Sequence, residues 1–327
     1  MSPASCPAFD RGLSALYLGI DLGGTNIRTA VVHIDGDRAT LRGRDARATP
    51  QTGADSVVAA LAASGQAALA AAETPIADIA AIGLSSPGPL DHQAGVILTT
   101  QNIAGFVDSH FPIAARLAAA LGGPTVYLDR DTVMAAIGEG TIGAAKGARD
   151  FVYLTVSTGV GGAIVSGGRM VRGTSNTAGE LGHFPVALAG GTRCRCGGYD
   201  CVESYAAGRN VAEAFGVTVT SLVYASAAAG DTRAAGIILR AEAALENLAV
   251  GIVNALNPER IVVGGSVTEH QPTHVLDPMR RAIAERAFKV PAAAVQVVPS
   301  VLGGDVSIIG AALAARDRAA GRGEWFL

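Results

Sequence analysis

The chain has 327 residues, of which 49% are hydrophobic and 16% are charged, and its formal net charge is −3. This length and apolar content suffice for two ordinary domains with a large core, and they exclude a disordered, charge-rich chain. The small negative charge lacks the basic footprint of a nucleic-acid-binding protein, so we expect no nucleic-acid partner.

The beginning of the chain and its hydropathy predict the compartment. The first twenty residues lack the basic segment and long apolar stretch of a signal peptide. Nowhere does a run of about 18 apolar residues predict a membrane span. We therefore expect a cytoplasmic protein with no membrane partner, a compartment in which disulfides are rare.

The first half of the chain alternates strands and helices. Residues 16–34, LYLGIDLGGTNIRTAVVHI, predict two β-strands around a tight glycine-rich turn. The segments that follow predict a helix at 55–72, a buried strand at 79–87, a helix at 112–121 and a strand at 125–128. This alternation predicts an α/β fold.

The opening pattern returns near residue 150. Residues 151–173, FVYLTVSTGVGGAIVSGGRMVRG, again predict strand, glycine-rich turn and strand. We interpret the two segments as copies of one supersecondary unit that face each other; the alternative is two unrelated hairpins. The rest predicts an amphipathic helix at 236–256, a strand at 260–267 that runs into a Gly-Gly turn, and a closing helix at 303–319.

The glycine turns predict a nucleotide phosphate clamp. Paired glycines after a strand let backbone N–H groups converge on an anion. The spacing is neither that of a Walker loop nor that of a dinucleotide fingerprint. Asp21, before the first turn, is expected to hold Mg²⁺ through water. The other candidate residues are Gly23, Gly24, Thr25, Thr158, Gly159, Gly161, Gly264 and Gly265.

Three of the four cysteines lie in GHFPVALAGGTRCRCGGYDC, residues 182–201. Cys194, Cys196 and Cys201 follow His183, and three thiolates with one imidazole suit a closed tetrahedral Zn²⁺ site. Because four protein ligands leave no open position, we predict a structural zinc. The alternatives are reduced buried thiols and a redox pair, although redox pairs are more often spaced C-x-x-C.

Taken together, the motifs resemble the ROK family of sugar kinases. DLGGTNIR, SSPGPLD, STGVGG, AGELGH, CRCGGYDCVES and NPERIVVGGSV occur in the order expected of that family, over about residues 16–315. The family belongs to the hexokinase–actin–acetate kinase superfamily. The resemblance implies two ribonuclease-H-like α/β domains, with ATP and sugar in the cleft between them. We expect a small domain at 12–128 plus 305–327, a large domain with the zinc loop at 129–304, and a homodimer or homotetramer.

The resemblance also implies a sugar site. Sugar hydroxyls are expected to contact residues that match the family's motifs, namely Gly88, Asn102, Glu180, His183 and Glu203. His183 would ligate zinc with its other ring nitrogen, so that the metal sets its tautomer.

The family's general base is the aspartate of an Asn-Asp-Ala-Asn motif that ends eight residues later in glutamate. Counting back from Glu139 leads to Asp131, with Asp129 as the alternative. This chain departs from the motif, because Arg130 and Val133 replace the two asparagines and Thr132 replaces the alanine.

Arg130 is counted among the substrate-binding residues. If its guanidinium points into the cleft, its charge should lower the pKa of Asp131. The alternative is that the side chain turns outward to solvent.

The expected reaction is ATP-dependent phosphorylation of the 6-hydroxyl of a hexose, with glucose favoured and N-acetylglucosamine or N-acetylmannosamine as alternatives. A catalytically inactive sugar sensor and a ROK repressor are alternatives from another class. A repressor would carry a helix-turn-helix before the core, and none is expected because DLGGT starts at Asp21. Retention of Asp131 and both phosphate turns favours an enzyme.

Overall fold

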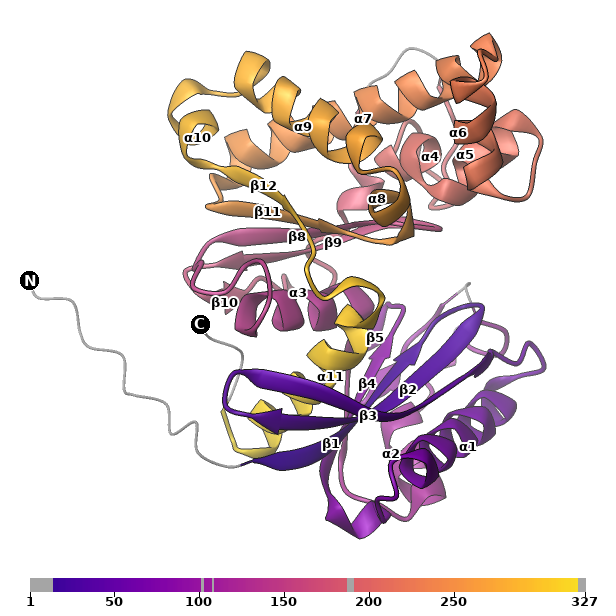
Figure 1. Cartoon of the computed structure of the whole chain (residues 1–327). Helices are drawn as coiled ribbons and strands as arrows, with labels where there is room; N and C mark the ends of the chain where they lie inside the picture. Colours follow the sequence, from indigo (N-terminus) through magenta and orange to yellow (C-terminus); the bar gives the residue numbers. More distant parts are fainter. Residues whose placement is uncertain (1–13, 101–102, 108, 187–190, 323–327) are drawn as a thin grey trace, which may run out of the picture.

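The computed structural model describes residues 14–100, 103–107, 109–186 and 191–322. Two five-stranded mixed β-sheets lie one above the other, with helices on their outer faces and between them (Figure 1). We call the half built on the N-terminal sheet the first lobe and the half built on the other sheet the second lobe.

The two sheets have the same topology. In the first, three antiparallel strands are followed by two strands parallel to the first of them, in the order β3-β2-β1-β4-β7. The second repeats this arrangement in the order β10-β9-β8-β11-β12. The first sheet comprises β1 (Ala15–Leu22), β2 (Asn26–Asp35), β3 (Arg38–Ala48), β4 (Ile79–Ser86) and β7 (Val126–Arg130). The second comprises β8 (Phe151–Val156), β9 (Val160–Ser166), β10 (Arg169–Met170), β11 (Arg260–Gly264) and β12 (Gln296–Pro299). The interpretation as two copies of one unit is confirmed, and the alternative of two unrelated hairpins is wrong.

Helices cover the outer face of each sheet. On the first lobe these are α1 (Ala54–Ala71) and α2 (Ile113–Leu121), beside the short helix η1 (Ile76–Asp78) and the hairpin β5 (Leu90–Asp91) and β6 (Val96–Ile97). By length and composition α1 could cross a membrane, but Val57, Leu61 and Leu69 are buried in the core of the first lobe. It is therefore built like the core helix of a globular domain.

The second lobe carries more helices. The long helix α7 (Thr232–Leu256) begins at Asp231, whose side chain accepts the backbone N–H of Ala234, and ends at Asn257 in the left-handed conformation. The other helices of this lobe are η2 (Leu181–His183), α4 (Val202–Ala206), α5 (Gly208–Phe215), α6 (Thr220–Ala228), α8 (Ser266–His270), α9 (Pro272–Arg286) and α10 (Lys289–Ala294).

Two helices join the lobes. α3 (Asp131–Thr141) follows β7 and packs on β8 and β9, while α11 (Val306–Ala319), preceded by η3 (Gly303–Asp305), returns to pack on β1 and β4 (Figure 1). The two helices cross closely, since a Cβ added at Gly310 would lie 1.7 Å from the carbonyl oxygen of Met134. A third apolar core lies around these helices, between the sheets.

The predicted elements are present, but the prediction omits others. These include the charged strand β3, the strand β12 and the helices α3, α5, α6 and α9. The strand expected at 260–267 ends at Gly264, and α8 begins at Ser266. Gly161 was assigned to the second turn, but it lies in β9.

Candidate active site and zinc centre

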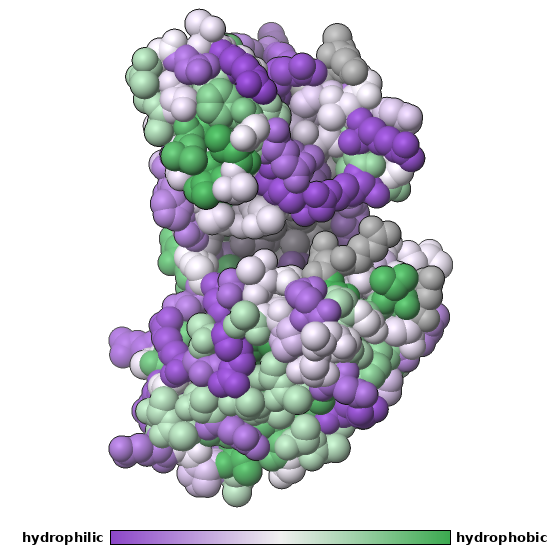
Figure 2. All heavy atoms as spheres, turned by 90° about the vertical axis from the view of Figure 1, so that its right-hand side faces the viewer, coloured by the Kyte–Doolittle hydropathy of each residue, from purple (hydrophilic) through white to green (hydrophobic). Residues whose placement is uncertain are grey.

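The surface is hollowed between the two lobes, and Figure 2 shows this recess facing the viewer. The loops at the ends of β1 and β8, and the junction between β7 and α3, bring together the motifs that the sequence analysis selected. Asn102 lies outside the described residues.

Asp131 is the first residue of α3 and is partly buried. Its Oδ1 accepts the backbone N–H of Thr132 at 2.7 Å. Burial raises the pKa of Asp131 to about 6, and the negative charges of Asp21 and Glu180 add to this effect. The Thr132 N–H and the Arg130 guanidinium act in the opposite direction. Such a carboxyl is suited to accept a proton near neutral pH.

Arg130 lies inside the protein, with a side chain only 3% exposed. Its Nη1 donates to Oε1 of Glu180 at 2.9 Å, and its Nη2 donates to the carbonyl oxygen of Ala178. The outward, solvent-facing pose is therefore wrong. Its charge lowers the pKa of Asp131, as expected, but burial and the neighbouring carboxylates outweigh this effect and the net shift is upward.

Asp129, the alternative base, has a very different environment. It is fully buried, with Arg172 donating to both of its carboxylate oxygens at 2.9 and 2.8 Å and Arg318 adding a third contact at 2.5 Å. Burial alone would raise the pKa of Asp129, but the hydrogen bonds and charge of Arg172, with the charge of Arg318, hold it below the usual value. An enclosed carboxylate paired with two arginines is unsuited to receive a substrate proton.

Asp21 lies at the end of β1 and is mostly buried. Its Oδ2 accepts from Arg28 at 2.6 Å and its Oδ1 accepts from Ser85 at 2.9 Å. The negative charge of Asp21 is near enough to contribute to the raised pKa of Asp131. A carboxylate oxygen is the type of ligand that Mg²⁺ prefers, so Asp21 at the end of β1 fits the predicted ion.

The first glycine turn, Gly23–Thr25, is anchored by residues that follow β3. The hydroxyl of Thr49 donates to the carbonyl oxygen of Gly23 at 2.7 Å. The backbone N–H of Thr49 donates to the carbonyl oxygen of Thr25 at 2.8 Å. Gln51 donates to the carbonyl oxygen of Gly24 at 3.0 Å. These hydrogen bonds to its carbonyl oxygens hold the turn in place, and Thr25 is exposed.

Residues of the second turn line a pocket of about 620 Å³ in the second lobe. The third predicted turn adjoins it, since Gly265, with φ of 95°, leads into α8. The exposed Thr158 belongs to the pocket wall, while Gly159 is next to Glu203. The wall is made by Ser157, Thr158, Gly208, Arg209, Ala212, Glu213, Val217–Ser221, Tyr224, Ser266, Val267, His270 and Gln271. Sequence reasoning missed the part at 208–224, which has no glycine pair or charge pattern to mark it.

The predicted sugar residues converge from both lobes. Gly88 packs against Arg130, since an added Cβ would lie 3.2 Å from the Arg130 Cδ. Glu180 is half exposed and is held by Arg130. Glu203, in α4, accepts the backbone N–H of Val160 through Oε2 at 3.1 Å. Gly88 and Glu180 thus both contact Arg130, and Glu203 lies beside the second glycine turn.

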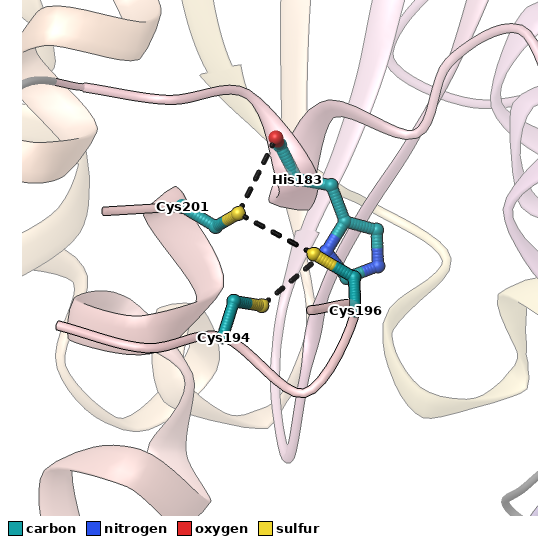
Figure 3. Close-up of side chains that lie close together, drawn as sticks. All are labelled: His183, Cys194, Cys196 and Cys201. Atoms are coloured by element: carbon teal, nitrogen blue, oxygen red, sulfur yellow. Dashed lines mark hydrogen bonds between the residues drawn. The ribbon is translucent and has the colours of Figure 1, made fainter. Parts of the chain in front are cut away.

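His183, Cys194, Cys196 and Cys201 form one compact cluster, and their ligand atoms all lie within 4.8 Å of one another (Figure 3). The Cys196 and Cys201 sulfurs are 3.7 Å apart, and the Cys194 sulfur lies 3.6 Å from Nδ1 of His183. Tetrahedral zinc with ordinary bond lengths separates such ligand atoms by roughly 3.6–3.8 Å. The cluster therefore fits zinc in both chemistry and geometry.

The loop around the cluster is tied to α4. Asp200 accepts the backbone N–H of Thr192 at 2.8 Å and the hydroxyl of Tyr205. Burial raises the pKa of the Cys201 thiol to about 12, so its thiolate requires a compensating cation. Cys201 immediately precedes α4, which carries Glu203, and His183 lies three residues after Glu180. The cluster thus joins the segments that hold two of the predicted sugar carboxylates.

Comparisons with known proteins agree with this geometry. A model of the ROK family matches residues 17–318. A glucokinase from Halalkalibacterium halodurans is 30% identical over 313 residues, which cover 90% of this chain and 93% of that protein. An N-acetylmannosamine kinase from Citrobacter koseri is 34% identical over 255 residues, covering 76% and 83% respectively.

Among solved structures, a ROK family glucokinase from Streptomyces griseus in complex with glucose and AMPPNP is similar, with 27% identity and a TM-score of 0.77. The match covers 93% of this chain and 100% of that one. The shared fold, the match to the family model and the His/Cys cluster all indicate the same family. The chain therefore belongs to the ROK family, as a glucokinase-like sugar kinase.

Proposed function

We propose that this chain transfers the γ-phosphoryl group of ATP to the 6-hydroxyl of glucose. The observation that carries the proposal is the contrast at the β7–α3 junction. Asp131 has a pKa raised to about 6 and adjoins the predicted sugar residues, whereas Asp129 is locked between two arginines. Similarity to the Streptomyces griseus glucokinase bound to glucose and AMPPNP supports the choice of sugar and donor.

In the proposed reaction, Asp131 accepts the proton of the sugar hydroxyl as the hydroxyl oxygen attacks the γ-phosphorus and ADP leaves. Asp21 would hold Mg²⁺ through water, and the bound ion supplies charge neutralisation to the phosphates. The N–H groups of Gly24, Thr25, Thr158 and Gly159 would orient the phosphates. Those of Gly23 and Ser157 already donate to backbone carbonyl oxygens within the two turns. The 620 Å³ pocket is the place we assign to the adenosine.

The cysteine cluster has a supporting role in this proposal. With zinc bound through Nδ1, the other ring nitrogen of His183 is available to a sugar hydroxyl, and the metal fixes which nitrogen carries the proton. Glu180 and Glu203 would accept hydrogen bonds from further sugar hydroxyls. Gly88, which has no side chain, would allow the sugar ring to approach closely.

N-acetylmannosamine is the second candidate substrate. The observation that favours it is the 34% identity to the Citrobacter koseri N-acetylmannosamine kinase, which is slightly above the 30% identity to the glucokinase. A kinase for this sugar needs space for the acetamido substituent, which glucose lacks, and a group that forms a hydrogen bond with it.

An ADP-release assay with glucose, N-acetylglucosamine and N-acetylmannosamine at equal concentrations would test the proposal. We expect the highest kcat/KM for glucose, and the product should be the 6-phosphate by ³¹P and proton NMR. The matched control is Asp131→Asn, which should abolish most turnover with every sugar. A higher kcat/KM for N-acetylmannosamine would favour the second candidate, and no ADP release with any sugar would refute kinase activity.

A further inference from the structure

Arg130 makes a connection between the lobes. It is the last residue of β7 in the first lobe, yet its guanidinium donates to Glu180 and to the carbonyl oxygen of Ala178, both in the second lobe. Its aliphatic stem lies against Gly88. Arg130 therefore lies between two residues that the proposed function assigns to the sugar site.

The contacts fix one half of the Glu180 carboxylate. Oε1 of Glu180 accepts from Arg130 at 2.9 Å, in a charge-assisted bond to a side chain that is 3% exposed. The Glu180 side chain is itself 49% exposed, so its other oxygen can still reach a ligand. A half-exposed glutamate without such a partner would sample several rotamers and lose entropy on binding.

Burial of Arg130 has a cost in stability. Its Nε is buried and has no hydrogen-bond partner. An unsatisfied buried donor destabilises a fold by about 1–3 kcal/mol. Costs of this kind are typical of residues retained for function.

We propose that Arg130 is a positioning residue, which reaches across the cleft to hold Glu180 in the orientation that accepts a sugar hydroxyl. This inference rests on the proposed function and adds to it a role for the residue that breaks the family's Asn-Asp-Ala-Asn motif. An asparagine at this position is too short to make both cross-lobe contacts. Arg130 thus couples the placement of Glu180 to the relative position of the lobes.

A double-mutant cycle on the full chain tests the proposal, with glucose kinetics as the readout. Arg130→Gln should raise the KM for glucose about tenfold with a smaller change in kcat, because it removes an interaction made in the bound ground state. Glu180→Gln should raise the KM at least as much. The double variant should be no worse than Glu180→Gln, because Arg130 acts through Glu180.

Arg130→Lys supplies the conservative rescue, since one ammonium can still donate to Glu180, and its KM should lie between those of the wild type and Arg130→Gln. Arg281→Gln is the matched control. It removes an arginine–carboxylate pair, with Glu246 at 2.7 Å, on the outer helices of the second lobe, and should leave the KM unchanged.

Two results would overturn the inference while the proposed function stands. One is an unchanged KM in Arg130→Gln and Arg130→Lys together with a lower melting temperature, which would make Arg130 purely structural. The other is an additive loss in the double variant, which would make the two residues independent. If the wild type releases no ADP with any hexose, the proposed function itself fails.

Discussion

Asp129 and Asp131 are two residues apart and have opposite environments. Asp131→Asn keeps the size and the acceptor for the Thr132 N–H but cannot take a proton, so we expect turnover to fall roughly 10²–10⁴-fold.

Asp129→Asn should act through stability, because it weakens the pairing of the buried Arg172 and Arg318, at a cost of about 3–5 kcal/mol. Steady-state kinetics and chemical denaturation of both variants separate these effects. Near-normal turnover in Asp131→Asn would move the base elsewhere.

The pKa of Asp131 sets the acidic limb of activity. A base must be ionised, and a pKa raised to about 6 means that kcat/KM should fall as pH drops through this value. An unperturbed aspartate would place the limb about two pH units lower. The measurement is kcat/KM for glucose between pH 5 and pH 8. A rate that stays flat down to pH 5 would exclude a base with the environment described.

The same carboxyl should reduce stability. Because its folded-state pKa lies above its ordinary value, the folded state binds the proton more tightly than the unfolded state, and ionisation above pH 6 costs folding free energy. Asp131→Asn removes this cost, so the free energy of unfolding at pH 8 should rise by roughly 1–2 kcal/mol. The gain should vanish as pH falls towards about 4. Urea denaturation of both proteins at the two pH values tests this.

Asp131 could be selected from the sequence as the candidate base because of Glu139, and the structure shows what Glu139 binds. The fully buried Glu139 accepts from the Ser300 hydroxyl and from the backbone N–H groups of Val301 and Leu302. It thus ties α3 to the segment that leads into α11. The hydrogen bond from Arg130 to Glu180 could not be predicted in this way. It joins residues far apart in the sequence, and no local sequence pattern records that they are close in space.

The zinc loop is the element in which metal and substrate binding should be linked. Cys196→Ser removes one of four ligands and should lower the zinc content from about one per chain, the melting temperature and the affinity for glucose together. Metal analysis, thermal denaturation and glucose titration provide the three measurements. A metal-free preparation with unchanged melting and kinetics would contradict a structural zinc.

Among the elements, those predicted from the sequence include buried strands and an amphipathic helix, whereas the buried α3 was not predicted. The apolar runs of β1, β4 and β8 and the amphipathic α7 are apparent in the sequence because each packs into a core. The strand β3 was missed because it alternates exposed and half-buried residues, many of them arginine, and its strand character depends on pairing with β2. The pocket residues at 208–224 were missed for a similar reason, since only the fold places α5 and α6 beside α8.

At the scale of the whole molecule, the crossing of α3 and α11 holds the lobes together. Gly310→Ala would put a Cβ 1.7 Å from the carbonyl oxygen of Met134, and a backbone atom cannot move aside cheaply. We expect destabilisation by about 3 kcal/mol or more. Gly236→Ala in α7 is the matched control, because nothing lies within 4 Å of its new Cβ. It should be neutral or stabilise by up to about 1 kcal/mol. Equal denaturation midpoints for the two variants would contradict the close crossing.

The position of α11 also bears on how the protein is made. Residues 306–319 cover the inner face of a sheet whose strands all precede residue 131, with Ile308 against Gly19 and Ala311 against Gly83. During synthesis, the first lobe therefore leaves the ribosome without the helix that completes its core. The second lobe has its own sheet and outer helices before α11 emerges. Folding from the N-terminus, the usual order for domains, is thus unfavourable here, and the lobe translated first is completed last.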